Sequence, residues 1–281
     1  MWNLHKLGWI AAFGIAGLNV GAQTCSAQGT SSSQGTMAKP ADGKSRVQSH
    51  DSITVTANYT PEEKEDWKIN EVYQRIYSLE QKGDCETAVE RYKAEVIPLA
   101  EQSKFEGPKK KFLSLANEGI GACYMTQRRY AEAEERFRQN IDYLPTDDSS
   151  YPINFREIGR AQMGQQHWVA AEESLKKSVS IFDPQIQKAL NSKYEFVRTE
   201  QVGFLCGAKA RTLAYLAVVY LREERTTESL KTAELAYDEA TQPNVPSTVA
   251  TDIAKVGRMV AQAAGDENAI AKWSQRTLPE K

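Results

Sequence analysis

The sequence predicts an all-α protein, an α-solenoid of about five antiparallel helical hairpins. Small residues, aromatic residues and prolines recur in a similar order along much of the chain, which is typical of a helical hairpin repeated several times. The 281 residues are 41% hydrophobic and 26% charged, a composition found in ordinary globular proteins. Because one hairpin cannot bury its own apolar face, the hairpins are expected to stack on one another.

Residues 1–27 are expected to form a secretory signal peptide. Lys6 precedes the largely apolar stretch LGWIAAFGIAGLNV, and small residues follow at Val20-Gly21-Ala22 and Cys25-Ser26-Ala27, which is the order of features in signal peptides. The apolar stretch is shorter than the roughly 20 residues of a membrane-spanning helix. The mature protein is therefore predicted to be periplasmic or secreted, with no membrane span, and an uncleaved N-terminal anchor is the alternative.

Residues 28–59 are expected to form a flexible linker. The segment is rich in Ser, Gly, Thr and Gln and poor in large apolar residues, so it cannot bury enough surface to offset the entropy lost on ordering. The residues SITVT at positions 52–56 alternate as a strand does, but this segment is too short and too isolated to stand alone.

The helical repeat domain is predicted to span residues 60–281 and to begin with a capped helix. Thr60 is a good N-cap, Pro61 suits the first helical position, and Glu63 can bond back to the Thr60 amide. The first hairpin is expected from Trp67 to about Phe105.

The second hairpin carries the clearest pattern, within the stretch from Asn117 to Pro145. Small residues mark where two antiparallel helices approach closely, aromatic residues fill the wider gaps, and a proline ends the second helix because it has no amide hydrogen to donate. The positions that carry this pattern are Gly121, Tyr124, Tyr130, Ala133, Phe137 and Pro145. Their spacing resembles the tetratricopeptide repeat (TPR), a helix-turn-helix unit of about 34 residues.

Three further hairpins resemble the same motif. The third runs from Tyr151 to Asp183, the fourth ends near Pro243, and the fifth runs from about Ser247 to Leu278. The motif positions are occupied by Gly159, Trp168, Ala171 and Leu175 in the third hairpin, by Ala217, Tyr220, Ser229, Ala233 and Ala236 in the fourth, and by Gly257, Val260, Ala269 and Trp273 in the fifth. The resemblance thus covers residues 67–278.

The chain between the third and fourth hairpins is longer than a TPR turn. Asp183-Pro184 is predicted to restart a helix, because a capping residue followed by a proline is a typical helix start. Residues 185–199 would then form an extra helix or an extension. The next helix contains GFLCGAKARTLAYLAVVYL, which is apolar on more than one side, so it is expected to lie centrally in the stack.

The resemblance implies that the first helix of each hairpin lines a concave groove that binds a protein or peptide partner. The groove-facing positions with the aromatic, Met or Arg side chains that are common in interfaces are Tyr73, Tyr77, Met125, Arg156, Arg160, Met163 and Arg211. The three arginines could hold a carboxylate or phosphate through forked hydrogen bonds. The alternative is that they are solvated or paired with Glu118, Glu157 or Glu200.

The sequence does not indicate an enzyme, a cofactor site or a metal site. Of three histidines, His167 alone lies in the predicted repeat domain, and no nucleophile elbow, zinc motif or glycine-rich phosphate loop is present. The adjacent pairs Glu134-Glu135, Glu172-Glu173 and Glu223-Glu224 would point about 100° apart on a helix and are predicted to form solvated faces. With 35 Lys and Arg against 37 Asp and Glu, no basic face for nucleic acid is expected.

Three cysteines remain if the signal peptide removes Cys25. They are Cys85, Cys123 and Cys206, which could form one disulfide plus a free thiol or could be three buried thiols. Burial is favoured because Cys123 and Cys206 lie in apolar helical stretches. Cys85 and Cys123 are the first pair to test for a disulfide, since they belong to adjacent hairpins.

These predictions together indicate an exported, non-enzymatic protein-interaction scaffold. The alternative is a structural subunit that self-assembles, with its groove filled by its own chain or by a second copy. The sequence names neither the partner nor the oligomeric state.

Overall fold

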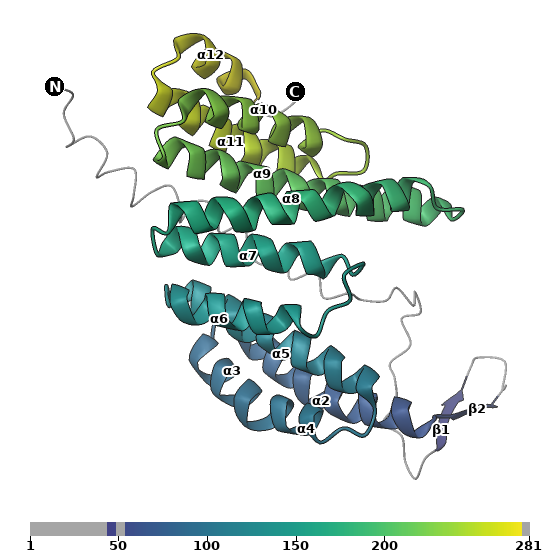
Figure 1. Cartoon of the computed structure of the whole chain (residues 1–281). Coiled ribbons are helices and arrows are strands. Elements are labelled where there is room, and N and C mark those ends of the chain that lie inside the picture. The colour runs from purple at the N-terminus through teal and green to yellow at the C-terminus, as the bar shows by residue number, and fades with distance from the viewer. Residues whose placement is uncertain (1–43, 49–53, 277–281) are drawn as a thin grey trace. The chain divides into compact units, whose positions relative to one another are not determined.

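The computed structural model describes residues 44–48 and 54–276, so the predicted signal peptide and most of the predicted linker lie outside it. The chain divides into two compact units, Met1–Gly119 and Ile120–Lys281. Five antiparallel helical hairpins occupy the described residues (Figure 1), which confirms the predicted all-α class. They are α2 (Pro61–Gln81) with the segment 85–101, α5 (Glu106–Thr126) with α6 (Tyr130–Ile141), α7 (Ser150–Gly164) with α8 (Trp168–Leu190), α9 (Val202–Arg222) with α10 (Thr226–Ala240), and α11 (Ser247–Ala264) with α12 (Glu267–Arg276).

A short β-hairpin precedes the first helix in sequence. Strand β1 (Lys44–Gln48) pairs antiparallel with β2 (Thr54–Asn58), and Val47 lies opposite Val55. The predicted strand-like segment at positions 52–56 overlaps β2, but its partner was not predicted. The sequence of β1, KSRVQ, has a single large apolar residue, so it lacks the alternating pattern by which a strand is recognised.

The N-terminus of α2 has the predicted capping box. The Thr60 hydroxyl accepts a hydrogen bond from the Glu63 amide (3.2 Å), and the Glu63 carboxylate accepts one from the Thr60 amide (2.7 Å). The hydrogen bond from the Thr60 amide lowers the pKa of Glu63. Pro61 occupies the first turn, where no amide donor is needed. The predicted start of this helix is therefore confirmed.

The second half of the first hairpin is an interrupted helix. Gly83 turns the chain with a positive φ of 82°, and α3 (Cys85–Arg91) then continues through the π-helical turn η3 (Tyr92–Val96) into α4 (Ile97–Glu101). Pro98 lies in the first turn of α4. Proline cannot donate the usual helical hydrogen bond, and the π turn lies just before Pro98, where the regular hydrogen-bond pattern of the helix is interrupted.

Glycines allow close helix packing in the unit that begins at Ile120. A Cβ atom added to Gly121 would lie 2.8 Å from the Phe137 ring of α6, and one added to Gly159 of α7 would lie 2.7 Å from Cγ of Leu175 in α8. Phe137 and Leu175 are both buried. The close approach predicted from the small residues is therefore present in both hairpins.

Helix α8 does not restart at Asp183-Pro184, so that prediction was wrong. The helix continues through Pro184 to Leu190, which confirms the alternative of an extension as far as that residue. Phe182 and Ile186, which lie on either side of Pro184, are buried in one cluster with Leu205 of α9. Burial of these apolar side chains stabilises the continuous helix by more than the one hydrogen bond that Pro184 cannot donate. A second π turn, η4 (Val197–Gln201), then leads into α9.

Helix α9 is the most thoroughly buried helix of its unit, as its composition predicted. It packs against α8, α10 and α11, and Figure 1 shows it between α8 and α11. Within the described chain, Val197–Arg222 is the one helical stretch long and apolar enough to cross a membrane, and 72% of its apolar window is buried inside the protein. Its place among these helices accounts for its apolar composition.

The last hairpin packs around a buried indole. A Cβ atom added to Gly257 of α11 would lie 2.5 Å from the Trp273 ring of α12, and Trp273 is fully buried. Tyr237 of α10 contacts the same ring edge-on, with ring centroids 5.6 Å apart. Gly265 ends α11 in the left-handed conformation, as is common at helix C-termini. The predicted fifth hairpin is thus confirmed.

Candidate functional site

The predicted residues Arg156 and Arg160 lie one turn apart on α7 and share one carboxylate. The Arg156 guanidinium binds Oε1 of Glu157, with Nε at 2.9 Å and Nη2 at 2.7 Å, and Nη1 of Arg160 lies 2.5 Å from Oε2. The three side chains are largely buried, with exposed fractions of 16% for Arg156, 14% for Glu157 and 24% for Arg160. The predicted alternative to ligand binding was that the arginines are solvated or paired with a nearby glutamate, and the structure shows Arg156 and Arg160 paired with Glu157.

Burial and the neighbouring charges shift the pKa values of Glu157 and Arg160 in opposite directions. Burial alone would raise the pKa of Glu157, but the positive charges of Arg160 and Arg156 outweigh it and hold that pKa below its usual value. Burial alone would likewise lower the pKa of Arg160, yet the negative charge of Glu157 raises it. Glu157 and Arg160 are therefore charged at neutral pH, and because arginine side chains in proteins keep their positive charge, two positive charges face one negative charge.

Helix α9 completes the candidate site with Tyr215. The Arg160 guanidinium lies over the Tyr215 ring, 5.1 Å from its centroid, a cation–π contact that joins α7 to α9. Arg211 precedes Tyr215 by one helical turn, so both lie on the same face of α9. Arg211 is half-buried and has contacts of its own. Tyr215 was not predicted as a site residue, although its position four residues after Arg211 could have revealed it.

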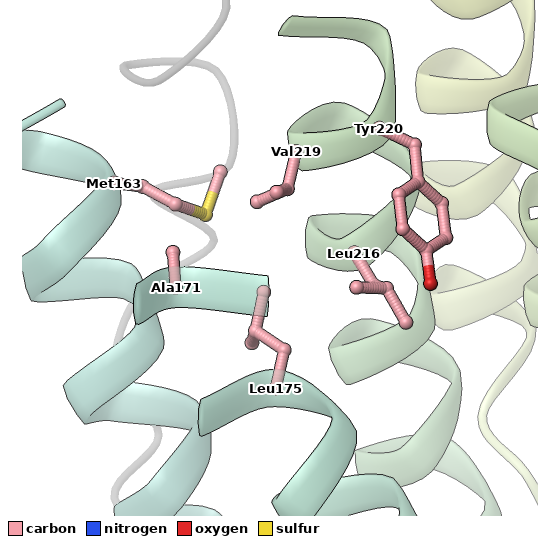
Figure 2. Close-up of a cluster of buried hydrophobic side chains, with 6 residues drawn as sticks. All are labelled: Met163, Ala171, Leu175, Leu216, Val219 and Tyr220. Atoms are coloured by element: carbon pink, nitrogen blue, oxygen red, sulfur yellow. The ribbon is translucent and has the colours of Figure 1, made fainter. Parts of the chain in front are cut away.

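Met163 lies in the hydrophobic core, which corrects its predicted place on a binding surface. It is only 6% exposed and belongs to a cluster with Leu175, Leu216 and Val219 (Figure 2). Met163 follows Gly159 by one turn on α7, and the close approach of α8 at Gly159 leaves this face of α7 no access to solvent. Met125, near the end of α5, is half-buried and retains some accessible surface.

Tyr73 and Tyr77 belong to the unit that ends at Gly119. Their rings stack with centroids 5.7 Å apart and planes 16° apart, and Tyr73 also contacts the rings of Tyr92 and Phe112. Tyr73 is 5% exposed, so the structure corrects its prediction as a contact residue and makes it an aromatic core residue. Tyr77 is half-buried and is the member of this pair that a partner could touch.

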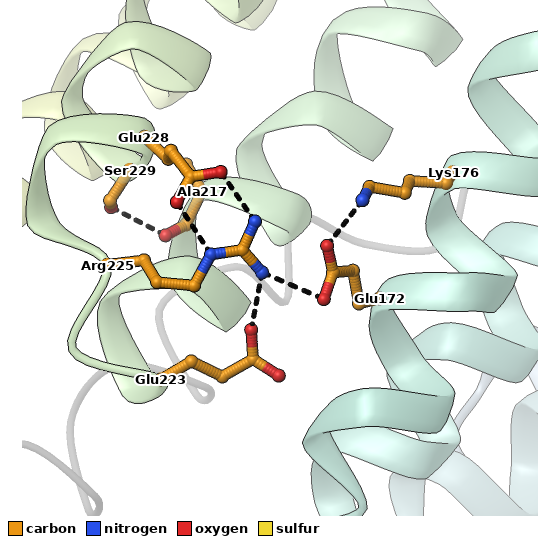
Figure 3. Close-up of polar contacts among 7 residues, drawn as sticks. All are labelled: Glu172, Lys176, Ala217, Glu223, Arg225, Glu228 and Ser229. Carbon is orange, nitrogen blue, oxygen red and sulfur yellow. Dashed lines mark hydrogen bonds and ion pairs between the residues drawn. The ribbon is translucent and has the colours of Figure 1, made fainter.

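A second charged cluster lies around Arg225, just before α10. Its guanidinium binds Glu172 and Glu223, both at 2.9 Å, and Glu228, with a shortest contact of 2.5 Å (Figure 3). Glu172 also binds Lys176. This cluster ties the turn between α9 and α10 to α8, and its positive charges are outnumbered by carboxylates. Its role is structural, in contrast to the cationic excess on α7.

The adjacent glutamate pairs are only half solvated, which corrects the prediction of solvated faces. Glu134, Glu172 and Glu223 are 17%, 14% and 16% exposed in their side chains and form ion pairs, whereas the second member of each pair is exposed. When a helix packs on one side, adjacent residues differ in burial, because their side chains point about 100° apart.

Within residues 44–48 and 54–276, no three His, Cys, Asp or Glu side chains come together as a metal site. Cys85, Cys123 and Cys206 are buried and carry no disulfide, and their burial is what the preferred interpretation predicted. Burial, together with the nearby charge of Glu239, raises the pKa of Cys206 to about 11. The described cysteines thus behave as small apolar residues.

The sequence matches no protein-family model and no curated protein. The structure, however, is similar to two crystal structures of nearly identical TPR-like repeats from a putative kinesin light chain of Podosopora anserina. One has a TM-score of 0.55 and 18% identity and covers 75% of this chain and 93% of that chain. The other has a TM-score of 0.54 and 16% identity, with 75% and 94% covered. This protein therefore has the fold of the TPR-like repeat proteins, as the spacing of its small and aromatic residues predicted.

Proposed function

We propose that this protein is an exported scaffold that binds a protein or peptide partner on the surface formed by α7 and α9. The observation that carries the proposal is the cluster of Arg156, Arg160 and Tyr215 on the first helices of two successive hairpins. Arginine and tyrosine are enriched in protein interfaces and contribute strongly to binding there. Stacked helical repeats present extended surfaces suited to such partners.

The binding role is tested by affinity capture from the native compartment. The variant Arg156→Ala/Arg211→Ala is expected to lose most of the proteins that the wild-type chain captures, because it removes cationic side chains from both helices. Quantitative mass spectrometry of the two captures measures the difference.

The matched control is Arg138→Ala on α6. Arg138 is 58% exposed and forms an ion pair with Glu134, so its removal changes net charge but leaves every charged side chain of α7 and α9 in place. Circular dichroism verifies that each variant is folded. Capture of the same proteins in the same amounts by the wild type and the double variant would exclude this surface as the binding site.

Export is supported by the N-terminal sequence alone. Residues 1–27 are proposed to be removed, which would leave a periplasmic or secreted protein with no N-terminal anchor. Intact mass spectrometry of the protein from its native cells is expected to give a chain that begins near Gln28, in the extracytoplasmic fraction. A chain that retains residues 1–27 and stays with the membranes would instead indicate the uncleaved anchor.

A further inference from the structure

We propose that the partner presents an acidic peptide segment, with a carboxylate bound by Arg156 and Arg160 beside Tyr215. This inference rests on the proposed function and adds the chemistry of the partner. It depends on three features of the cluster, namely its charge, its remaining hydrogen-bond donors and the way its side chains are held.

The cluster has one positive charge in excess. Glu157 contacts both arginines, with Oε1 bound to Arg156 and Oε2 bound to Arg160. Its single negative charge can balance only one of their two positive charges. The two arginine side chains are at most a quarter exposed, which limits their hydration. A partly desolvated cation gains more from an anionic partner than a fully solvated one.

Both arginines keep donors for such an anion. Of the three guanidinium nitrogens of Arg160, Nη1 binds Glu157, and no acceptor among the described residues contacts Nε or Nη2. Arg156 uses Nε and Nη2 on Glu157, and in the same part of the chain its Nη1 has no acceptor. Arginine N–H groups form two parallel hydrogen bonds with a carboxylate, so the unused donors match this ligand.

The surrounding contacts fix the orientation of the cationic groups before a partner arrives. Glu157 holds both guanidiniums, and the Tyr215 ring supports that of Arg160. Little side-chain entropy is then lost on binding, which improves affinity. Arg225 differs from this cluster, because it binds three carboxylates of the same chain, those of Glu172, Glu223 and Glu228, and therefore has no excess positive charge.

A peptide carboxylate fits better than a phosphate. One excess positive charge balances one carboxylate, whereas a phosphate group carries about −1.5 to −2 at neutral pH. The helical faces of α7 and α9 continue beyond the cluster, with Arg211 one turn from Tyr215, and an extended peptide can follow such a surface.

The test selects ligands from a library of random 12-residue peptides displayed on phage, with the full folded chain as bait. Peptides enriched by the wild type are expected to contain at least about twice the input frequency of Asp and Glu. Arg156→Gln removes the excess charge yet leaves Glu157 paired with Arg160, so this variant should fold. Synthetic copies of the selected peptides are expected to bind it about tenfold more weakly, equivalent to about 1.4 kcal/mol.

Two further variants show whether the cluster itself is responsible. Arg138→Gln removes an exposed charge on α6 and is expected to bind like the wild type. Glu157→Gln removes the negative charge of the cluster, while its amide oxygen can still accept a hydrogen bond from an arginine. This variant is expected to bind acidic peptides more tightly, because the added net positive charge outweighs the weaker hold on the two guanidinium groups, a gain that a purely structural role of Glu157 would not produce. Weaker binding by folded Glu157→Gln would count against the proposal.

The remaining outcomes separate this inference from the proposed function. Peptides that are enriched without an acidic preference, and that still bind Arg156→Gln more weakly, would overturn the acidic partner and leave the binding surface in place. Acidic peptides that bind Arg156→Gln and the wild type equally would overturn the assignment to this cluster. No enrichment over a bait-free control would contradict peptide binding altogether.

Discussion

Raising the pH from 5 to 9 is expected to lower the free energy of unfolding by up to roughly 3 kcal/mol through one residue, Glu80. Burial raises the pKa of Glu80 from 4.5 to about 7, although a hydrogen bond from the Tyr92 hydroxyl (3.0 Å) opposes the shift. Because the folded-state pKa is the higher one, the stabilisation is complete below pH 4.5 and is lost as the pH rises through 7. Burial, together with the charges of Glu118 and Glu80, also raises the pKa of the neighbouring Tyr73.

Urea denaturation followed by circular dichroism at pH 5, 7 and 9 measures this loss. The matched variant is Glu80→Gln, which keeps a side chain of the same shape and an oxygen that can accept from Tyr92. Carboxyl groups with lowered pKa values, such as Glu157, lose their stabilisation at lower pH, so they do not contribute in this range. If the wild type and Glu80→Gln changed in parallel between pH 5 and 9, Glu80 would not be the responsible group.

Gly159→Ala is expected to lower the free energy of unfolding by about 1–3 kcal/mol. The new methyl group would lie 2.7 Å from Cγ of Leu175 and 3.4 Å from the Ala171 carbonyl oxygen. Leu175 is fully buried and has no room to move, so α7 and α8 must separate. Thermal unfolding should show a decrease of about 2–4 °C for each kcal/mol lost.

Gly207→Ala in α9 is the matched control. Gly207 is also buried in the first helix of a hairpin, but an added Cβ would lie 3.4 Å from its nearest neighbour, Cγ1 of Val245. Alanine is the better helix former by roughly 0.5–1 kcal/mol, so this variant should be as stable as the wild type or more stable. Equal destabilisation by both substitutions would show that close helix packing at Gly159 is not the cause.

Much of the fold could be predicted because its packing depends on local signals. Gly121, Gly159 and Gly257 each face a large buried side chain of the following helix, and such pairs recur at a spacing that a sequence displays directly. The continuation of α8 through Pro184 could not be predicted in the same way. It depends on contacts with residues of α9, and such tertiary contacts override a local preference for ending a helix.

The candidate site was predictable only in part, for a similar reason. Arg156 and Arg160 were found because they lie one turn apart on one helix, and Glu157 was recognised as a pairing partner. Tyr215 lies one turn after Arg211, which could have marked it as a residue of the same face of α9, but its contact with Arg160 joins two helices and is not visible in the sequence of either helix alone. Met163 and Tyr73 were misplaced because Met and aromatic side chains suit both interfaces and cores, and only the packed structure distinguishes the two.

The buried thiols have a consequence for folding. Cys85, Cys123 and Cys206 are buried and carry no disulfide, and a thiol whose pKa is about 11, as for Cys206, remains protonated and unreactive at neutral pH. Residues 54–276 are therefore expected to fold without an oxidant or a disulfide isomerase. Recombinant material made in a reducing cytoplasm should have the same helices as protein made in an oxidising compartment.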